Sequence, residues 1–154
     1  WNYGGGAKTI SKASGQPLDV AEHFVEKMAE AYPLVVRWRQ DCADQGENGY
    51  IYNAWGRRMS VNIERSYTQS SALMGQSGTR EIMTDALIRM LKCDIRLIHW
   101  LRAQIHDELI FSVPESELEW AVPKIAELMS TTWNGVEFTA AHGQPADDWE
   151  HASH

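Results

Sequence analysis

Two apolar segments on either side of His106-Asp107-Glu108 constrain the fold of this chain more than any other feature. Residues 97–105 and 109–113 are rich in Leu, Ile, Phe and Val, and only three polar residues separate them. Apolar runs joined by so short a polar segment favour two antiparallel strands and a tight turn. The turn would place two adjacent carboxylates and an imidazole at the tip of a hairpin.

Helical patterns occupy much of the remaining chain. Apolar residues recur at helical spacing over residues 17–45, and Pro33 is expected to divide this stretch into two helices. From Thr79 to about Cys93, apolar residues mark one face of a further helix that packs on a core. These patterns and the hairpin together predict an α+β fold.

Two smaller elements complete the predicted fold. Residues 50–52 and 59–61 flank a linker that contains Gly56, which favours a second hairpin with a turn longer than two residues. A last helix is expected to begin near Pro114, with Ser116 and Glu119 as its capping box, and a polar tail follows it. The expected architecture is therefore a set of helices packed around the hairpin that carries His106-Asp107-Glu108.

The composition is that of a folded globular chain, with 44% hydrophobic and 23% charged residues in 154. No apolar run approaches the roughly eighteen residues of a membrane span, and the amino terminus lacks a secretory signal. These features predict a cytoplasmic protein without a membrane partner. Cys42 and Cys93 lack metal-ligand spacing and are too few for a disulfide framework, so reduced thiols are expected.

The net charge of −7 conceals an asymmetry between the two ends of the chain. Residues 1–102 contain thirteen of the fourteen basic residues against eleven acidic ones, whereas residues 103–154 contain one basic and ten acidic residues. Affinity for DNA comes mainly from neutralising phosphates with Lys and Arg, so the total charge argues at first against a nucleic-acid partner, but this total does not describe the first stretch. The acidic stretch is either a solvated surface or a source of carboxylates that bind a cation.

The string Gln104-Ile105-His106-Asp107-Glu108-Leu109 resembles the last motif of family A (polymerase I-like) DNA polymerases. In that family a Gln, an aliphatic residue and then His-Asp-Glu-Leu turn the corner between two strands of the palm. The apolar flanks match as well. Considered alone, Asp and Glu at a turn are common turn formers, so this simpler interpretation stays open.

Other segments resemble the same family in the same order along the chain. Tyr3-Gly4 is similar to the pair that closes the fingers helix over the incoming nucleotide, and Gly56-Arg57-Arg58 is similar to the Gly-Arg-Arg of a small ribbon. Gln76 resembles the Gln at the entry to the helix beside the palm hairpin, and Trp149 lies in a similar carboxy-terminal tail. The many Trp residues suggest a bacteriophage member.

The sequence also departs from the family pattern. The chain begins at Trp1, without the Arg and Lys that hold the triphosphate eight and twelve residues before the Tyr, and without the first palm motif and its Asp. We therefore expect it to be cut from something longer. Ala72 stands where the family usually has an Asn four residues before Gln76, and Gln69 is a candidate to replace that Asn.

The resemblance implies roles for the residues at the hairpin tip and near the amino terminus. Asp107 would bind catalytic Mg²⁺, whose ligands are hard carboxylate oxygens. Glu108 would be an auxiliary catalytic ligand or a partner of Tyr3. Tyr3, Gly4 and His106 would bind substrate, His106 at the primer end, although a turn histidine that only packs is the alternative.

DNA contacts are implied for four further residues. Arg57 and Arg58 are adjacent and face opposite ways in a strand, so at most one of them is expected to reach a phosphate directly. Gln76 and Gln104 would read the minor groove, where every correct pair offers acceptors at the same places. The alternatives are helix capping for Gln76 and a hydrogen bond on the sheet face for Gln104.

The implied function is template-directed DNA synthesis by a DNA-directed DNA polymerase, with two Mg²⁺ ions, deoxynucleoside triphosphates and primer-template DNA. Residues 1–48 would be fingers-side helices and residues 49–154 a palm portion, completed by the upstream part of the same polymerase. The chain alone is expected to be inactive. Two alternatives remain: a non-catalytic DNA-binding or assembly piece of a divided polymerase, and a metal hydrolase built on the acidic hairpin.

Overall fold

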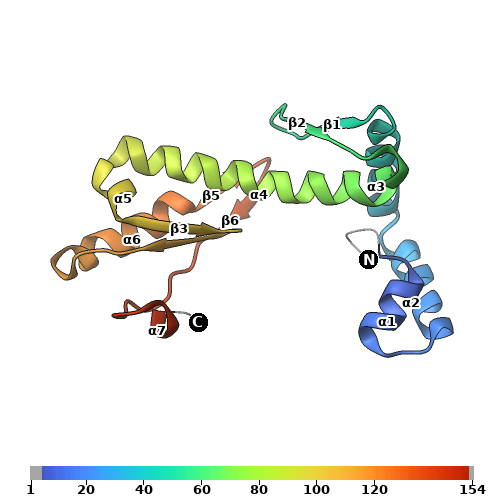
Figure 1. The fold of residues 1–154 in the computed structure, drawn as a ribbon, viewed down its shortest axis with the longest axis horizontal. Helices are drawn as coiled ribbons and strands as arrows, with labels where there is room; N and C mark the ends of the chain where they lie inside the picture. Colours follow the sequence, from blue (N-terminus) through green and yellow to red (C-terminus); the bar gives the residue numbers. More distant parts are fainter. Residues whose placement is uncertain (1–4, 153–154) are drawn as a thin grey trace. The chain divides into compact units, whose positions relative to one another are not determined.

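The computed structural model describes residues 5–152 and confirms the α+β fold (Figure 1). Its strands form three separate two-stranded antiparallel hairpins. The chain divides into two compact units, the first ending at Gly78 and the second beginning at Thr79. The division falls inside the long helix α4 (Ser66–Cys93), and each unit has its own buried cluster. No helix in the described range is both long and apolar enough to cross a membrane.

The first unit begins with three helices: α1 (Ala7–Ser14), α2 (Leu18–Ala31) and α3 (Pro33–Gly46). Pro33 occupies the first turn of α3, where the missing N–H costs nothing, so the predicted division at Pro33 is confirmed. Helix α1 was not predicted. It ends at Gly15, whose φ of 70° is the left-handed conformation common just after a helix.

The predicted small hairpin is confirmed as β1 (Tyr50–Tyr52) and β2 (Arg58–Ser60), with Tyr52 opposite Arg58. Asn53 shapes its loop, because the buried side-chain oxygen accepts hydrogen bonds from the backbone N–H groups of Trp55 and Arg57 at 3.0 and 2.9 Å. Ile51, on the inner side, is 1% exposed and packs with α3 and α4. The buried members of this cluster are Cys42, Ile51 and Val61, with Met59, Leu73 and Met74 against them.

Helix α4 is 28 residues long, so the predicted start at Thr79 is wrong. A 3-10 turn, η1 (Ile63–Arg65), leads into it. Besides Leu73 and Met74, the inner side of the first half of α4 carries small polar residues, the buried Ser70, Ser71 and Ser77. Small side chains let neighbouring backbones approach closely, and this packing overrides the low helix propensity of Ser and Gly.

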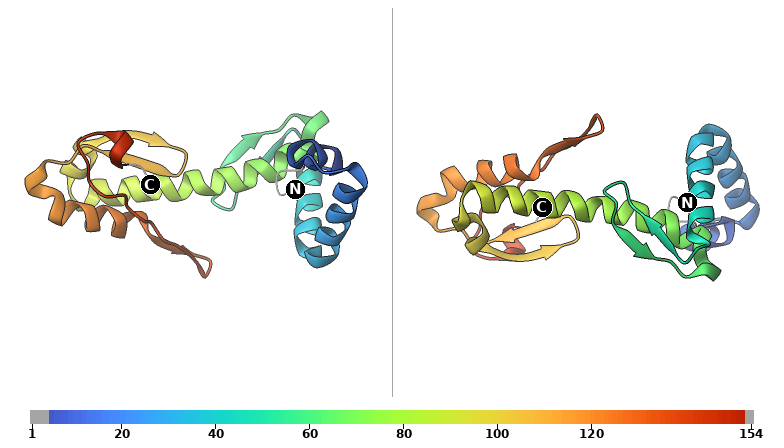
Figure 2. Two further views of the ribbon diagram at one scale, coloured as in Figure 1. Left: turned by 90° about the horizontal axis from the view of Figure 1, so that it is seen from below. Right: turned by 90° about the horizontal axis from the view of Figure 1, so that it is seen from above.

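The second unit surrounds a core formed by Met90, Leu97, Ala121 and Ile125. Its elements are α5 (Ile95–Trp100), β3 (Leu101–Ile105), β4 (Glu108–Phe111), the 3-10 turn η2 (Glu115–Glu117) and α6 (Leu118–Met129). Figure 2 shows α6 and the β3–β4 hairpin on either side of the second half of α4. The predicted hairpin is confirmed, but residues 97–100 belong to α5 and not to its first strand.

The carboxy-terminal part differs from the prediction in two ways. The residue before α6 is Glu117, and no side chain caps the helix there, so the capping box of Ser116 and Glu119 is wrong. The segment expected as a polar tail contains a third hairpin, β5 (Thr131–Trp133) with β6 (Val136–Phe138), and the short helix α7 (Trp149–Ala152). Asn134 and Gly135, both at positive φ, form its turn.

Candidate functional site

The β3–β4 hairpin places Asp107 in a two-residue turn. Ile105 pairs with Glu108, so the turn consists of His106 and Asp107 and is one residue shorter than predicted. His106 has φ 53°, a left-handed conformation in which His is enriched among residues other than glycine. The strand pairing on both sides therefore fixes the backbone of Asp107.

The hairpin presents polar groups at its tip and apolar groups behind it. His106, Asp107 and Glu108 are exposed, whereas Leu109 and Phe111 pack on the core of the second unit. In the described part of the chain, no hydrogen bond or ion pair engages the carboxylates of Asp107 and Glu108. The strand pairing thus holds the backbone of these solvent-facing carboxylates in a defined position.

The donor set at the tip fits only part of a metal site. Asp107 supplies carboxylate oxygens, the hard ligands that Mg²⁺ prefers. Within residues 5–152, however, no group of three or more His, Cys, Asp or Glu side chains could hold a metal ion. The chain can therefore contribute ligands to a metal centre, but the described residues do not complete one.

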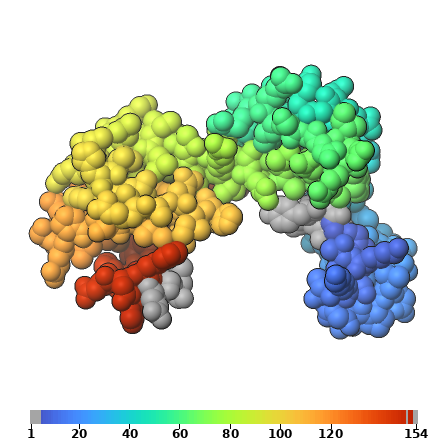
Figure 3. Space-filling model, viewed as in Figure 1, coloured from blue at the N-terminus to red at the C-terminus, as the bar shows by residue number. Residues whose placement is uncertain are grey.

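A hollow of about 1080 Å³ adjoins the hairpin in the second unit. Asp107 and Glu108 line it together with Arg102, apolar residues of α4 and α6, and the carboxy-terminal tail. In Figure 3 the part of the tail drawn in red lies below the hairpin. Acidic residues of the tail, Asp147 and Asp148, also line the hollow and add to its negative charge.

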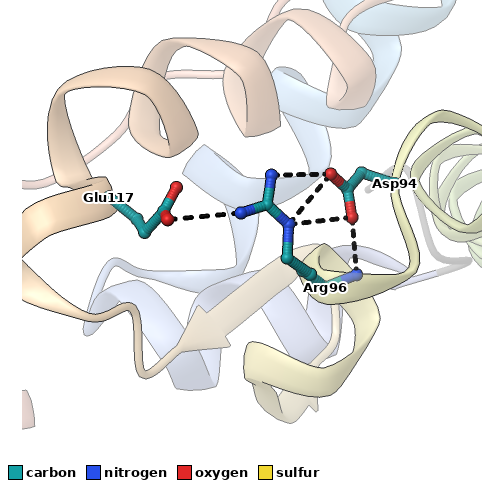
Figure 4. A network of polar contacts seen from close by, with 3 residues as sticks. All are labelled: Asp94, Arg96 and Glu117. Atoms are coloured by element: carbon teal, nitrogen blue, oxygen red, sulfur yellow. Dashed lines mark hydrogen bonds and ion pairs between the residues drawn. The ribbon is translucent and has the colours of Figure 1, made fainter.

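Arg96 joins the two segments that lead into and out of the hairpin (Figure 4). Its guanidinium donates to Asp94 Oδ2 at 2.8 Å and to Glu117 Oε1 at 3.2 Å. The guanidinium also lies over the rings of Trp100 and Trp120, 5.7 and 5.0 Å from their centroids. Hydrogen bonds from the Arg96 side chain and backbone lower the pKa of Asp94.

We refer to the contacts of Arg96 with Asp94 and Glu117 as the Arg96 clasp. It was not predicted. The capping signal of Asp94 before an apolar run was readable in the sequence, and its side chain indeed accepts from Arg96 N at 2.9 Å. The link to Glu117 spans 21 residues and has no local signal. It closes the base of the hairpin, at the opposite end from Asp107.

The residues predicted to contact DNA are exposed, but they belong to different units. Arg57, Arg58 and Gln76 lie in the first unit, and Gln104 lies on β3 in the second. Gln76 is in the interior of α4, so helix capping as its alternative role is wrong. Tyr3 and Gly4 fall outside the described residues.

Gln69 has a structural role that weakens its candidacy as a DNA contact. Its side-chain oxygen accepts from the backbone N–H of Asn62 at 2.7 Å, just before η1. Asn62 in turn caps η1 by accepting from Glu64 N at 3.0 Å. Gln69 thus helps to fix the entry to α4.

This chain resembles known DNA polymerases. It is 40% identical over 128 residues to the DNA polymerase of Mycobacterium phage L5, a match that covers 82% of this chain and 21% of that polymerase. The DNA polymerase of Mycobacterium phage D29 is 36% identical over 129 residues, covering 83% and 21%. The thermostable DNA polymerase I of Thermus aquaticus is 24% identical over 135 residues, covering 81% and 16%.

The fold of this chain also resembles that of a DNA polymerase. It is similar to the POL domain of Pol1 from M. smegmatis, solved in complex with DNA primer-template and dNTP, with a TM-score of 0.71 at 22% identity. The similarity covers 83% of this chain and 25% of that one. A sequence profile of DNA polymerase family A matches residues 1–149. The chain belongs to DNA polymerase family A, and it spans about a fifth of the length of the phage polymerases it matches.

Proposed function

We propose that this chain is the carboxy-terminal part of the polymerase domain of a DNA-directed DNA polymerase, with Asp107 as a ligand of the catalytic metal. The single observation that carries the proposal is the position of Asp107, exposed in a two-residue turn whose strands match the family motif. Residues 1–48 would belong to the fingers side and residues 49–154 to the palm.

The hairpin residues would act on the primer end. Asp107 would hold Mg²⁺, and two such ions would stabilise the attacking 3′-oxygen and the leaving pyrophosphate. Glu108 begins β4 opposite Ile105 and would act as an auxiliary ligand or as the partner of Tyr3. His106 would contact the primer, and its left-handed backbone conformation suits its position in the turn.

The remaining proposed contacts concern DNA and nucleotide. Gln76 and Gln104 would accept or donate hydrogen bonds at the minor groove, and Arg57 or Arg58 would bind a phosphate. Tyr3 and Gly4 would close on the deoxynucleoside triphosphate. Primer-template DNA and dNTP are present in the complex of the similar Pol1 domain, which supports these partners for the intact polymerase.

The test compares variants of the full-length polymerase that contains this chain. Asp107→Ala should reduce primer extension by several orders of magnitude while primer-template binding is retained, and Glu108→Ala should cost less. Primer extension would be measured at millimolar Mg²⁺, and binding by fluorescence anisotropy. Extension near the wild-type rate by the Asp107 variant would refute the assignment.

A second arm addresses the alternative of a non-catalytic assembly piece of a divided polymerase. The described residues do not complete a metal site, so the 154-residue chain alone should not incorporate nucleotides. It would then be mixed with a separately made piece that ends just before Trp1. Recovery of incorporation only in the mixture, and its loss with Asp107→Ala, would support a catalytic contribution. Recovery that survives Asp107→Ala would favour the assembly role.

A further inference from the structure

The β1–β2 hairpin has two chemically different faces. Side chains alternate along each strand, and residues paired across the ladder share a face. Ile51 pairs with Met59 on the inner face, which packs into the buried cluster. Tyr50, Tyr52 and Arg58 therefore lie on the outer face, with Tyr52 directly opposite Arg58. We refer to Tyr50, Tyr52 and Arg58 as the tyrosine face.

The side chains of the tyrosine face hold one another in place. The Arg58 guanidinium carbon lies 4.3 Å from the centroid of the Tyr50 ring. The rings of Tyr50 and Tyr52 meet edge to face, with centroids 5.7 Å apart and planes at 81°. Tyr52 nevertheless remains 51% exposed. The face thus offers aromatic surface and a cation that are already ordered, which lowers the entropy cost of binding.

The charge of this segment fits a phosphate-bearing ligand. From Asn48 to Ile63 the chain contains two arginines, Arg57 and Arg58, and no acidic residue. No ion pair engages Arg58 within the described residues. The bond from Arg57 N to the buried Asn53 fixes the loop beside the face, so both arginines extend from an ordered backbone.

Stacking surface next to a cation is the combination that recognises unpaired nucleotides. Bases of a single strand expose their flat faces and stack on aromatic rings, while basic side chains follow the phosphates. Paired bases inside a duplex do not offer these faces.

We propose that the tyrosine face binds unpaired nucleotides of a single DNA strand, namely the template strand beyond its paired region. The proposal rests on the proposed function for the identity of the strand. Tyr52 would stack on a base, and Arg58, steadied on Tyr50, would bind the adjacent phosphate. Trp55 has a different role, because its ring edge lies against Gly78 of α4, 3.6 Å from where a β-carbon would be.

The experiment uses the full-length polymerase and two DNAs with the same duplex, one blunt and one with a single-stranded 5′ template overhang. Tyr52→Ala should weaken binding to the overhang DNA by about tenfold, from the loss of one stacked base, and leave binding to blunt DNA unchanged. Tyr52→Phe should retain the affinity, since the ring is kept. Tyr32→Ala is the matched control, because Tyr32 is 52% exposed in the same unit but lies outside the face.

A 2-aminopurine placed in the overhang adds a direct readout, because stacking on Tyr52 quenches its fluorescence and Tyr52→Ala should restore it. Equal loss of affinity for both DNAs, or no loss for either, would overturn the proposal. A lowered melting temperature of Tyr52→Ala without an effect on DNA would also overturn it and indicate that another part of the polymerase covers the face. If Asp107→Ala still abolishes extension in that case, the proposed function stands and only this inference fails.

Discussion

Gly46, the last residue of α3, packs against α4 with no room for a side chain. A β-carbon there would overlap Ser70 Oγ and would lie 3.2 Å from Val61 Cγ1 and 3.3 Å from Ser66 Cβ. Gly46 and Ser70 are both buried, and Ser70 is 0% exposed. Gly46→Ala should therefore force α3 and α4 apart or displace the Ser70 hydroxyl. Either change would disturb the packing beneath the β1–β2 hairpin.

Two opposing effects set the change in the free energy of unfolding that Gly46→Ala causes. Ala is favoured over Gly in a helix by up to about 1 kcal/mol, and less at a helix end such as this one. Overpacking a buried site costs about 1–3 kcal/mol. The overlap with Ser70 should prevail, because three neighbouring groups confine the new methyl, and we expect a net destabilisation of about 1–2 kcal/mol. Urea unfolding of the chain, followed by circular dichroism, measures this free energy.

Two control variants separate close packing from helix propensity. Ser70→Ala removes the overlapping oxygen, for which the described residues offer no hydrogen-bond partner, so Gly46→Ala should cost at least about 1 kcal/mol less in that background. Gly75 has no neighbour within 4 Å of an added β-carbon, so Gly75→Ala should stabilise by up to about 1 kcal/mol. An equal cost of Gly46→Ala in both backgrounds would show that the Ser70 contact does not set it.

Two further predictions concern charged side chains. Replacing Arg57 and Arg58 by Ala should weaken DNA binding by the full-length polymerase and flatten the dependence of its DNA affinity on salt. Arg37→Ala is the control and should do neither. An unchanged salt dependence in the double variant would place Arg57 and Arg58 away from phosphates. Arg96→Ala should lower the melting temperature at neutral pH. Because the pKa of Asp94 is lowered in the folded chain, the stabilisation by the Asp94–Arg96 pair is complete above the ordinary pKa of Asp, about 4. It is lost as the pH falls through the lowered value. The melting-temperature difference should therefore shrink in acid, and an equal difference at both pH values would contradict the ion-pair explanation.

The sequence predicted those elements that depend only on residues within their own segment. Pro33 cannot continue a helix, so it separates α2 from α3 wherever the two helices pack. The apolar runs around residues 106–108 gave the β3–β4 hairpin, because alternation and a short polar turn are sufficient for that structure. The Asn134-Gly135 pair is an equally direct signal for the β5–β6 hairpin, although the surrounding segment is polar overall.

Elements whose cause is tertiary could not be predicted in this way. The first half of α4 mixes apolar residues with buried serines, and its packing depends on partners distant in the sequence: Ser70 lies against Gly46 of α3, and Leu73 and Met74 pack on the cluster around Ile51. Residues 97–100 are apolar enough for a strand, yet Asp94 caps them into α5 and Leu97 is fully buried in the helical core. The Arg96 clasp likewise depends on Glu117, whose proximity only the folded chain shows.

The simplest alternative role for Asp107 is that its carboxylate only helps to form the turn. Elsewhere in this chain Asn53, Asn62 and Asp94 form turns in the usual way for such residues, by accepting a hydrogen bond from the backbone N–H two residues later. At the β3–β4 tip the turn depends instead on the strand pairing of Ile105 with Glu108 and on the left-handed conformation of His106.

The carboxylate of Asp107 is therefore not what shapes this turn, and its side chain is directed to solvent from a backbone that its neighbours hold. A single carboxylate binds Mg²⁺ weakly, even on a fixed backbone, since the ion gives up its waters reluctantly and needs several oxygen ligands. Such a group gains a function when a second chain segment brings further ligands to it. If Asp107 is a metal ligand, as proposed, the metal centre must therefore be shared with residues beyond this hairpin.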